Sequence, residues 1–204
     1  MRNRIAYLFY PICILLFLNC ASYSKSGYRK QVDKLKKESL HKLNGTYSLY
    51  PISRYFGGRQ EPNDLIPDSL RYNNAHFFLL NSGYYEKQKL DSLLLPDKEY
   101  HINLHIEGKN KLQIKVLENK KVIQDTALTG KYRNGMFNLD NKFLDCNGIP
   151  YIFGGCDHNK RRIGVTKKGN LLINSAISSE GAILLILGAG HRYNVTFEYE
   201  RQTY

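Results

Sequence analysis

A short stretch in the second half of the chain carries residues that could hold a metal ion. Cys156, Asp157 and His158 are consecutive potential ligands, and Cys146 offers a further thiol. The first three could supply two ligands and Cys146 a third, whereas zinc sites usually need four well-spaced donors. The sequence therefore predicts no metal site, and nothing in it calls for a cofactor.

Catalytic signatures are also absent from the sequence. It contains no Gly-x-Ser-x-Gly, no His-Glu-x-x-His, no phosphate loop and no calcium loop. His101 and His105 alternate with apolar residues, so they lie on a predicted strand about 13 Å apart and cannot bind one ion. We predict that the chain is not an enzyme. A hydrolase or transferase would need acid and base residues gathered in one pocket, which strand order alone does not reveal.

Cys146 and Cys156 could instead form a disulfide, because exported proteins meet an oxidising compartment. The intervening Asn147-Gly148 is a preferred two-residue hairpin turn. Such a turn would pair Cys146 with Ile149 and leave the sulfurs about 20 Å apart. A proline directly after Ile149 is the argument for a wider loop. We predict the tight hairpin, with the disulfide possible but disfavoured.

Residues 1–19 have the pattern of a cleavable export signal. Arg2 and Arg4 precede an unbroken apolar run from Ile5 to Leu18, and small residues follow it. The run contains Pro11 and is shorter than the roughly 20 residues that a membrane-spanning helix needs. It is therefore predicted to direct export rather than to remain as an anchor.

The end of this signal, Phe17-Leu18-Asn19-Cys20, resembles that of bacterial lipoproteins. In that family the cysteine after the apolar run is acylated and becomes the first residue of the mature protein. The resemblance implies a permanent acyl anchor on Cys20, of the palmitate type, with membrane lipid as partner in the cell membrane or outer membrane. The alternative is ordinary cleavage near Ala21 or Ser22, which would give a periplasmic or secreted protein.

Residues 20–42 are predicted to form a basic, partly helical tether. The chain has a formal net charge of +12, and basic residues are dense in this stretch. They could rest on anionic lipid headgroups or form a solvated linker. A weak helical stripe could be formed by Val32, Leu35, Leu40 and Leu43. Nucleic acid is not a predicted partner, because no binding motif is present and exported proteins seldom meet it. Protein partners are unknown.

From residue 43 onward, apolar and polar side chains alternate in the way that half-buried strands require. Further short candidate strands follow the same pattern, one of them near 76–81. Asn134-Gly135 marks a tight turn between two of the candidate strands. Because the connections are short, the strands are predicted to form an antiparallel meander. Residues 51–75 contain too many glycines and prolines for regular structure and read as a long loop. The predicted core or cavity lining is Tyr47, Tyr100, Ile102, Leu104, Ile106, Leu112, Ile114, Val116, Tyr193, Val195, Phe197 and Tyr199.

The start of this domain resembles the lipocalin, or calycin, group. Leu43-Asn44-Gly45-Thr46-Tyr47 stands where lipocalins carry Gly-x-Trp on their first strand, and a long loop follows it. The family's closing arginine would be Arg192 or Arg201, packed over Tyr47. The resemblance implies an all-β domain over residues 43–204. Its meander of roughly 8–10 strands would close into a lipocalin-like barrel, which removes exposed sheet edges.

Ala182 to Leu187 form a continuous apolar run that is too short to span a membrane. Such a run predicts a strand buried on both faces. The alternative is a docking surface for another envelope protein.

Two functions fit this sequence. The first is a carrier or sensor of a small apolar ligand held inside the barrel, favoured by the many tyrosines, which combine apolar bulk with a hydroxyl group. The second is a structural or protein-interaction lipoprotein whose barrel is filled by its own side chains. The size of the interior decides between them.

Overall fold

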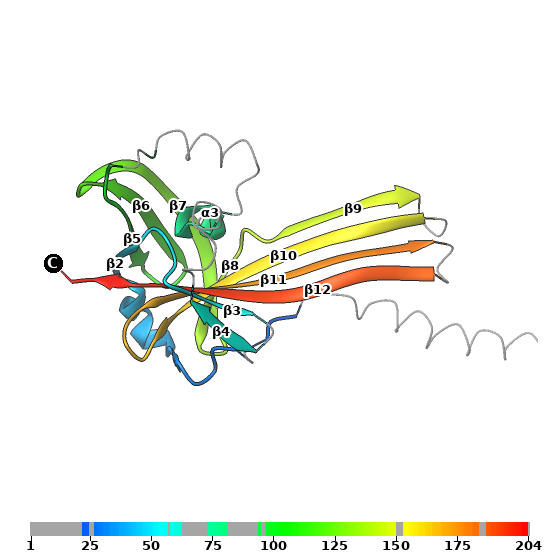
Figure 1. Ribbon diagram of the computed structural model, residues 1–204, viewed down its shortest axis with the longest axis horizontal. Helices are drawn as coiled ribbons and strands as arrows, with labels where there is room; N and C mark the ends of the chain where they lie inside the picture. The colour runs from blue at the N-terminus through cyan, green and yellow to red at the C-terminus, as the bar shows by residue number, and fades with distance from the viewer. Residues whose placement is uncertain are drawn as a thin grey trace, which may run out of the picture.

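The computed structural model describes residues 22–24, 27–56, 58–62, 73–80, 94, 97–149, 153–183 and 187–203. The predicted export signal and Cys20 lie outside these residues. Most of the described residues lie in antiparallel β-strands, and few of them lie in helices. The sheet curls into a half-barrel, and a long arm of four strands projects from it (Figure 1). No helix in the described part of the chain is long and apolar enough to cross a membrane.

All described strands belong to one sheet, in which neighbours run antiparallel. The half-barrel follows the order β13 (Arg201–Gln202), β2 (Gly45–Ser48), β5 (Tyr100–Glu107), β6 (Lys111–Glu118), β7 (Lys121–Arg133) and β8 (Met136–Leu139). The order continues with β10 (Phe153–Thr166), β11 (Leu171–Ile183), β12 (Leu187–Tyr199), β3 (Ser53–Phe56) and β4 (Arg59–Pro62). Two further strands, β1 (Val32–Asp33) and β9 (Phe143–Ile149), pair with β10.

The turn at Asn134-Gly135 is confirmed. Arg133 pairs with Met136, and both turn residues have positive φ, 54° for Asn134 and 83° for Gly135. This geometry is that of a primed two-residue turn, which matches the twist of the flanking strands. The predicted meander therefore holds from β5 to β8, where each strand pairs with the next one along the chain.

The arm consists of β9 and residues 153–160, 176–183 and 187–194 of β10, β11 and β12. β10 has 14 residues, and β11 and β12 have 13 each, whereas a typical strand has about five or six. Residues 161–166 of β10, 171–175 of β11 and 195–199 of β12 belong to the half-barrel. The remaining residues of these strands extend beyond it. The free ends of both hairpins lie together at the end of the molecule opposite the C-terminus (Figure 1).

The main core fills the concave side of the curled sheet. It gathers side chains from β2, β5, β6, β10, β11 and β12 together with α3 (Ala75–Leu80) and η1 (Lys37–Leu43). A second, smaller cluster contains Tyr28, Val32, Tyr55, Met136 and Leu172. Leu172 alternates with Leu171 and Ile173 of the main core, so this cluster lies on the other face of the sheet. Both faces at the base of the arm are therefore covered.

Two predictions about local structure are wrong. The stretch predicted as a strand near 76–81 forms α3, whose first turn is capped by Asn74 Oδ1 accepting from the Phe77 amide at 2.7 Å. The loop predicted at 51–75 contains the hairpin of β3 and β4, while 63–72 lie outside the described residues. Residues 27–43 of the predicted tether pack on the sheet, where η1 is its helical part, and the predicted stripe of Val32, Leu35, Leu40 and Leu43 is buried.

Candidate functional site

The residues predicted to line the barrel interior are mostly brought together. Ten of them share the main core, namely Tyr47, Tyr100, Ile102, Leu104, Ile106, Leu112, Ile114, Val195, Phe197 and Tyr199. Val116 is fully buried as well. Tyr193 is the exception, because it lies beyond the half-barrel on the arm and is 37% exposed. The prediction that Tyr193 belongs to the core is therefore wrong.

These core side chains leave little room between them. Tyr47, Ile102, Leu112 and Tyr199 are 0% exposed, and Leu104 is 1% exposed. A side chain that lines a hole large enough for a water molecule keeps some accessible surface, and these keep almost none. The centre of the half-barrel is thus packed by the protein's own side chains.

Arg201 lies over the ring of Tyr47, with its guanidinium carbon 5.0 Å from the ring centre. It donates to the Tyr47 hydroxyl at 2.9 Å and to the carbonyls of Lys42, Asn44 and Gly169. Burial raises the pKa of Tyr47 to about 12, which the positive charge of Arg201 partly opposes. Of the two arginines predicted to pack on Tyr47, the structure selects Arg201; Arg192 lies on the arm.

An open groove of about 440 Å³ lies at the base of β3 and is lined by Ile52, Ser53, Gln60, Lys168, Asn170 and Glu198. The Glu198 carboxylate is buried and accepts hydrogen bonds from the hydroxyls of Tyr55 at 2.5 Å and Ser53 at 3.3 Å. The Asn170 amide donates to its other oxygen at 2.8 Å. Because both oxygens are held by neutral donors, Glu198 is fixed as a structural link between β3, β12 and the β10–β11 turn.

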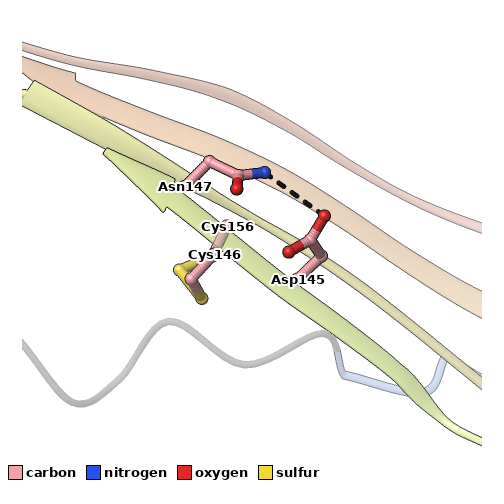
Figure 2. Close-up of a disulfide and its surroundings, with 4 residues drawn as sticks. All are labelled: Asp145, Cys146, Asn147 and Cys156. Carbon is pink, nitrogen blue, oxygen red and sulfur yellow. Dashed lines mark hydrogen bonds between the residues drawn. A yellow bond between two sulfur atoms is a disulfide. The ribbon is translucent and has the colours of Figure 1, made fainter.

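Cys146 and Cys156 form a disulfide that joins β9 to β10 (Figure 2). The two residues are directly opposite in the register, with their Cα atoms 4.1 Å apart. Asp145 and Asn147 point to the other face, where the Asn147 amide donates to Asp145 at 3.2 Å (Figure 2). The disfavoured bridge is therefore present, and the tight hairpin prediction at Asn147-Gly148 is wrong.

The physical reason is that the strand continues through the expected turn. Gly148 has φ 132° and pairs with Gly154, and Ile149 pairs with Phe153, so the reversal falls beyond Ile149. While the disulfide is formed, Cys146 and Cys156 are not available as metal ligands, because the ligand form of cysteine is the thiolate. Among the described residues, no group of three or more His, Cys, Asp or Glu is arranged to hold a metal ion.

The prediction that Ala182 to Leu187 form one buried strand is wrong. β11 ends at Ile183 and β12 begins at Leu187, so the run spans the end of a hairpin, and 184–186 lie outside the described residues. The same level of the arm is reached by Ile149 and Phe153 on the other hairpin. We call the row Ile149, Phe153, Ile183 and Leu187 the tip of the arm.

The N-terminal segment docks at the base of the arm. Asn194 of β12 accepts from the Ser24 amide at 2.9 Å and donates to the Ser22 carbonyl at 2.9 Å. Two cations of β10 lie over the ring of Tyr23, the Lys160 ammonium at 4.9 Å and the Arg162 guanidinium at 4.1 Å from the ring centre. The residues that follow the predicted anchor are thus held against the sheet.

Arg162 is the centre of this contact. Its buried guanidinium donates to Asn174 Oδ1 at 2.8 Å, to the Tyr28 hydroxyl at 2.7 Å and to the Ser24 carbonyl at 3.2 Å. Desolvation lowers the pKa of Arg162 and raises that of Tyr28. These partners come from segments far apart in sequence, so no local pattern signalled the cluster.

Four of the six exposed large apolar side chains among the described residues lie on or beside the arm, and the other two are Ile52 and Val122. Phe143 and Leu144 of β9 are 46% and 65% exposed, and Tyr193 packs edge-on against the exposed Phe56 at the base. The arm and its docked N-terminal segment are therefore the candidate functional site, and its chemistry is that of a contact surface. Comparisons with family models, curated proteins and solved structures find no match to this chain.

Proposed function

We propose that this chain is a lipid-anchored envelope protein of bacterial type that acts as a non-enzymatic structural or interaction module. Its lipocalin-like barrel is filled by its own side chains rather than hollow, and its arm is the surface that makes contacts with other molecules. The single observation that carries this proposal is the packing of Tyr47, Ile102, Leu104, Leu112 and Tyr199 with at most 1% of their surface exposed. A ligand of any size would have to displace these side chains from one another.

Closure of the barrel is supported by the continuity of the last two strands. Only Glu200 separates β12, which pairs with β11, from β13, which pairs with β2. The Glu200 carbonyl accepts from the Ser48 amide at 2.8 Å, so the contact is maintained across the gap. Arg201 then ties β13 to β2 through Tyr47. One continuous segment of chain therefore pairs with β11 along β12 and with β2 along β13, which supports closure of the barrel at this point.

The anchor on Cys20 is supported by the position of the residues just after it. Ser22 and Ser24 are fixed on Asn194, so residue 20 is at most about 7 Å of chain from the base of the arm. An acyl chain there would hold the arm beside a membrane. Several acyl chains, each contributing about 0.8 kcal/mol per buried methylene, would make the attachment effectively permanent.

The experiment that tests the anchor is metabolic labelling with a clickable fatty acid in a bacterial host. The wild-type chain is expected to carry the label and to fractionate with membranes. Cys20→Ala is expected to lose the label completely, whereas Cys13→Ala, within the export signal, should keep it. Label retained in Cys20→Ala, or absent from the wild type, would contradict the lipoprotein assignment.

A further inference from the structure

We propose that the outer side of the half-barrel, away from the main core, lies against an anionic lipid bilayer. The contact is made by six exposed cations that we call the basic face: Arg29, Lys30, Lys34, Arg133, Lys167 and Lys168. This inference rests on the proposed function, because export and the acyl anchor bring the chain to a membrane. It adds a second, electrostatic contact and fixes which side of the protein faces the lipid.

Residues 27–36 cross the outer side of the sheet with their apolar side chains pointing inward. Tyr28, Val32 and Leu35 are buried, and the first two belong to the second, smaller cluster. The side chains of Arg29, Lys30, Lys34 and Lys36 lie between them in sequence and are exposed. Packing of the apolar side chains on the sheet therefore presents cations to the solvent on this side.

Two turns from distant parts of the chain lie beside this segment. The Lys167 amide, in the turn between β10 and β11, donates to the Gln31 carbonyl at 2.8 Å. The Leu35 amide donates to the carbonyl of Gly135, in the turn between β7 and β8, at 3.1 Å. These turns carry the exposed side chains of Arg133, Lys167 and Lys168. The fold thus brings like charges from three segments to one face.

The charge of the basic face is not neutralised by the described part of the chain. Its segments, 27–36, 131–135 and 166–169, contain a single acid, Asp33, which pairs with Lys42 at 2.6 Å. None of the six cations forms an ion pair with a described residue. Like charges gathered in this way repel one another and destabilise the compact state. An anionic partner removes that repulsion, so the face is complementary to a negatively charged surface.

The position of the predicted anchor favours a membrane as that surface. The Arg162 side chain donates to both the Ser24 carbonyl and the Tyr28 hydroxyl, so residues 24–28 lie on one side of β10. The basic face continues from there along the same segment. Residue 20 is at most about 7 Å of chain from Ser22, which Asn194 holds on the sheet. An acyl group on residue 20 therefore brings lipid alongside these cations.

A membrane on this side leaves the opposite side of the arm facing away from the lipid. Phe143 and Tyr193 stand in the same row across the arm as Asn159. Asn159 alternates with Lys160, which lies over the Tyr23 ring on the outer side. The exposed aromatic side chains of the arm therefore point away from the bilayer, where they can contact other molecules as the proposed function requires.

The strength of this contact is expected to depend on salt. Each cation beside an anionic surface changes partitioning about fivefold, the equivalent of about 1 kcal/mol. The effect falls off within the Debye length, which is about 10 Å at 0.1 M salt and about 3 Å at 1 M. Binding through the basic face should therefore be lost at high salt, whereas an apolar contact would persist.

The test uses the mature chain, residues 20–204, with Cys20→Ala, so that no acyl chain contributes to binding. Vesicles of phosphatidylethanolamine and phosphatidylglycerol are compared with vesicles of phosphatidylcholine alone, and bound protein is measured by co-sedimentation. The chain is expected to bind the anionic vesicles at low salt, to be released from them at high salt, and to leave phosphatidylcholine unbound.

Variants on a single strand provide the matched comparison. Arg133→Gln is expected to lower partitioning about fivefold, and Lys34→Gln combined with Arg133→Gln about 30-fold, whereas Arg133→Lys should bind like the wild type. Lys121 is exposed at the start of β7, about 40 Å along the strand from Arg133 at its end. Because that distance exceeds the Debye length, Lys121→Gln should change partitioning by less than about twofold. Circular dichroism checks that all variants are folded.

Three outcomes would overturn the basic face as a membrane contact. An equal loss in Lys121→Gln would mean that net charge alone attracts the protein. Equal binding to phosphatidylcholine, or binding that survives high salt, would indicate an apolar contact. Binding to soluble polyphosphate without binding to vesicles would assign the face to a polyanion in solution.

The anchor and the basic face fail separately. Vesicle binding by the Cys20→Ala chain, with no fatty-acid label on wild-type Cys20, would overturn the anchor alone. A labelled wild-type chain whose Cys20→Ala form ignores anionic vesicles would overturn the basic face alone.

Discussion

Leu104→Ala is expected to lower the free energy of unfolding by about 3–5 kcal/mol. Leu104 lies on β5 in the main core with 1% of its surface exposed. In a filled interior, truncating this side chain removes buried methyl groups and leaves a cavity that the neighbours cannot close. Urea denaturation followed by circular dichroism measures the change, which is a large share of the roughly 5–15 kcal/mol that stabilises a domain.

Leu144→Ala is the matched control for this measurement. Leu144 is 65% exposed on β9, so the same substitution there should change the stability by less than about 0.5 kcal/mol. A ligand-binding interior would behave differently, because Leu104 would already face open space. A cost for Leu104→Ala as small as that of the control would therefore contradict a filled barrel.

Arg201→Ala is expected to cost about 2–4 kcal/mol of stability. Arg201 donates to the carbonyls of Lys42, Asn44 and Gly169 and to the Tyr47 hydroxyl, and it covers the Tyr47 ring. Its loss leaves several partly buried acceptors without their donor at the point where β13 meets β2. Urea denaturation gives the cost, and hydrogen exchange should show the earliest opening at β2 and β13.

Arg54→Ala provides the comparison for this variant. Arg54 forms a half-exposed ion pair with Glu61 at 2.6 Å, and such pairs contribute about 0–1 kcal/mol. The contact of Arg201 is also specific to the planar guanidinium, so Arg201→Lys should recover little. A cost for Arg201→Ala no greater than that of Arg54→Ala would show that this junction does not hold the sheet together.

Local sequence chemistry predicted the half-barrel better than it predicted the arm. Asn134-Gly135 and Asn147-Gly148 are both preferred turn sequences, but only the first forms a turn. At the second, the Cys146–Cys156 bridge and the long pairing of β9 with β10 outweigh the local turn preference. The decisive partner lies beyond the turn, so a local pattern could not reveal it.

Alternation identified strands but could not say what covers each face. Thr196 and Glu198 alternate with Val195 and Phe197, yet all four are buried. The second face of β12 is contacted by Tyr55, which donates to Glu198, and by the N-terminal segment, through contacts such as that of Ser24 with Asn194. Likewise Tyr193 continues the apolar alternation of β12, but the half-barrel ends before it. Where a long strand leaves the core is decided by distant segments of the chain.

The most direct test of the filled barrel is native mass spectrometry of the Cys20→Ala mature chain purified from a bacterial host. We expect a single species at the mass of the polypeptide, both as isolated and after incubation with fatty acids. A co-purified apolar molecule, or a stoichiometric mass shift with a fatty acid, would contradict this account.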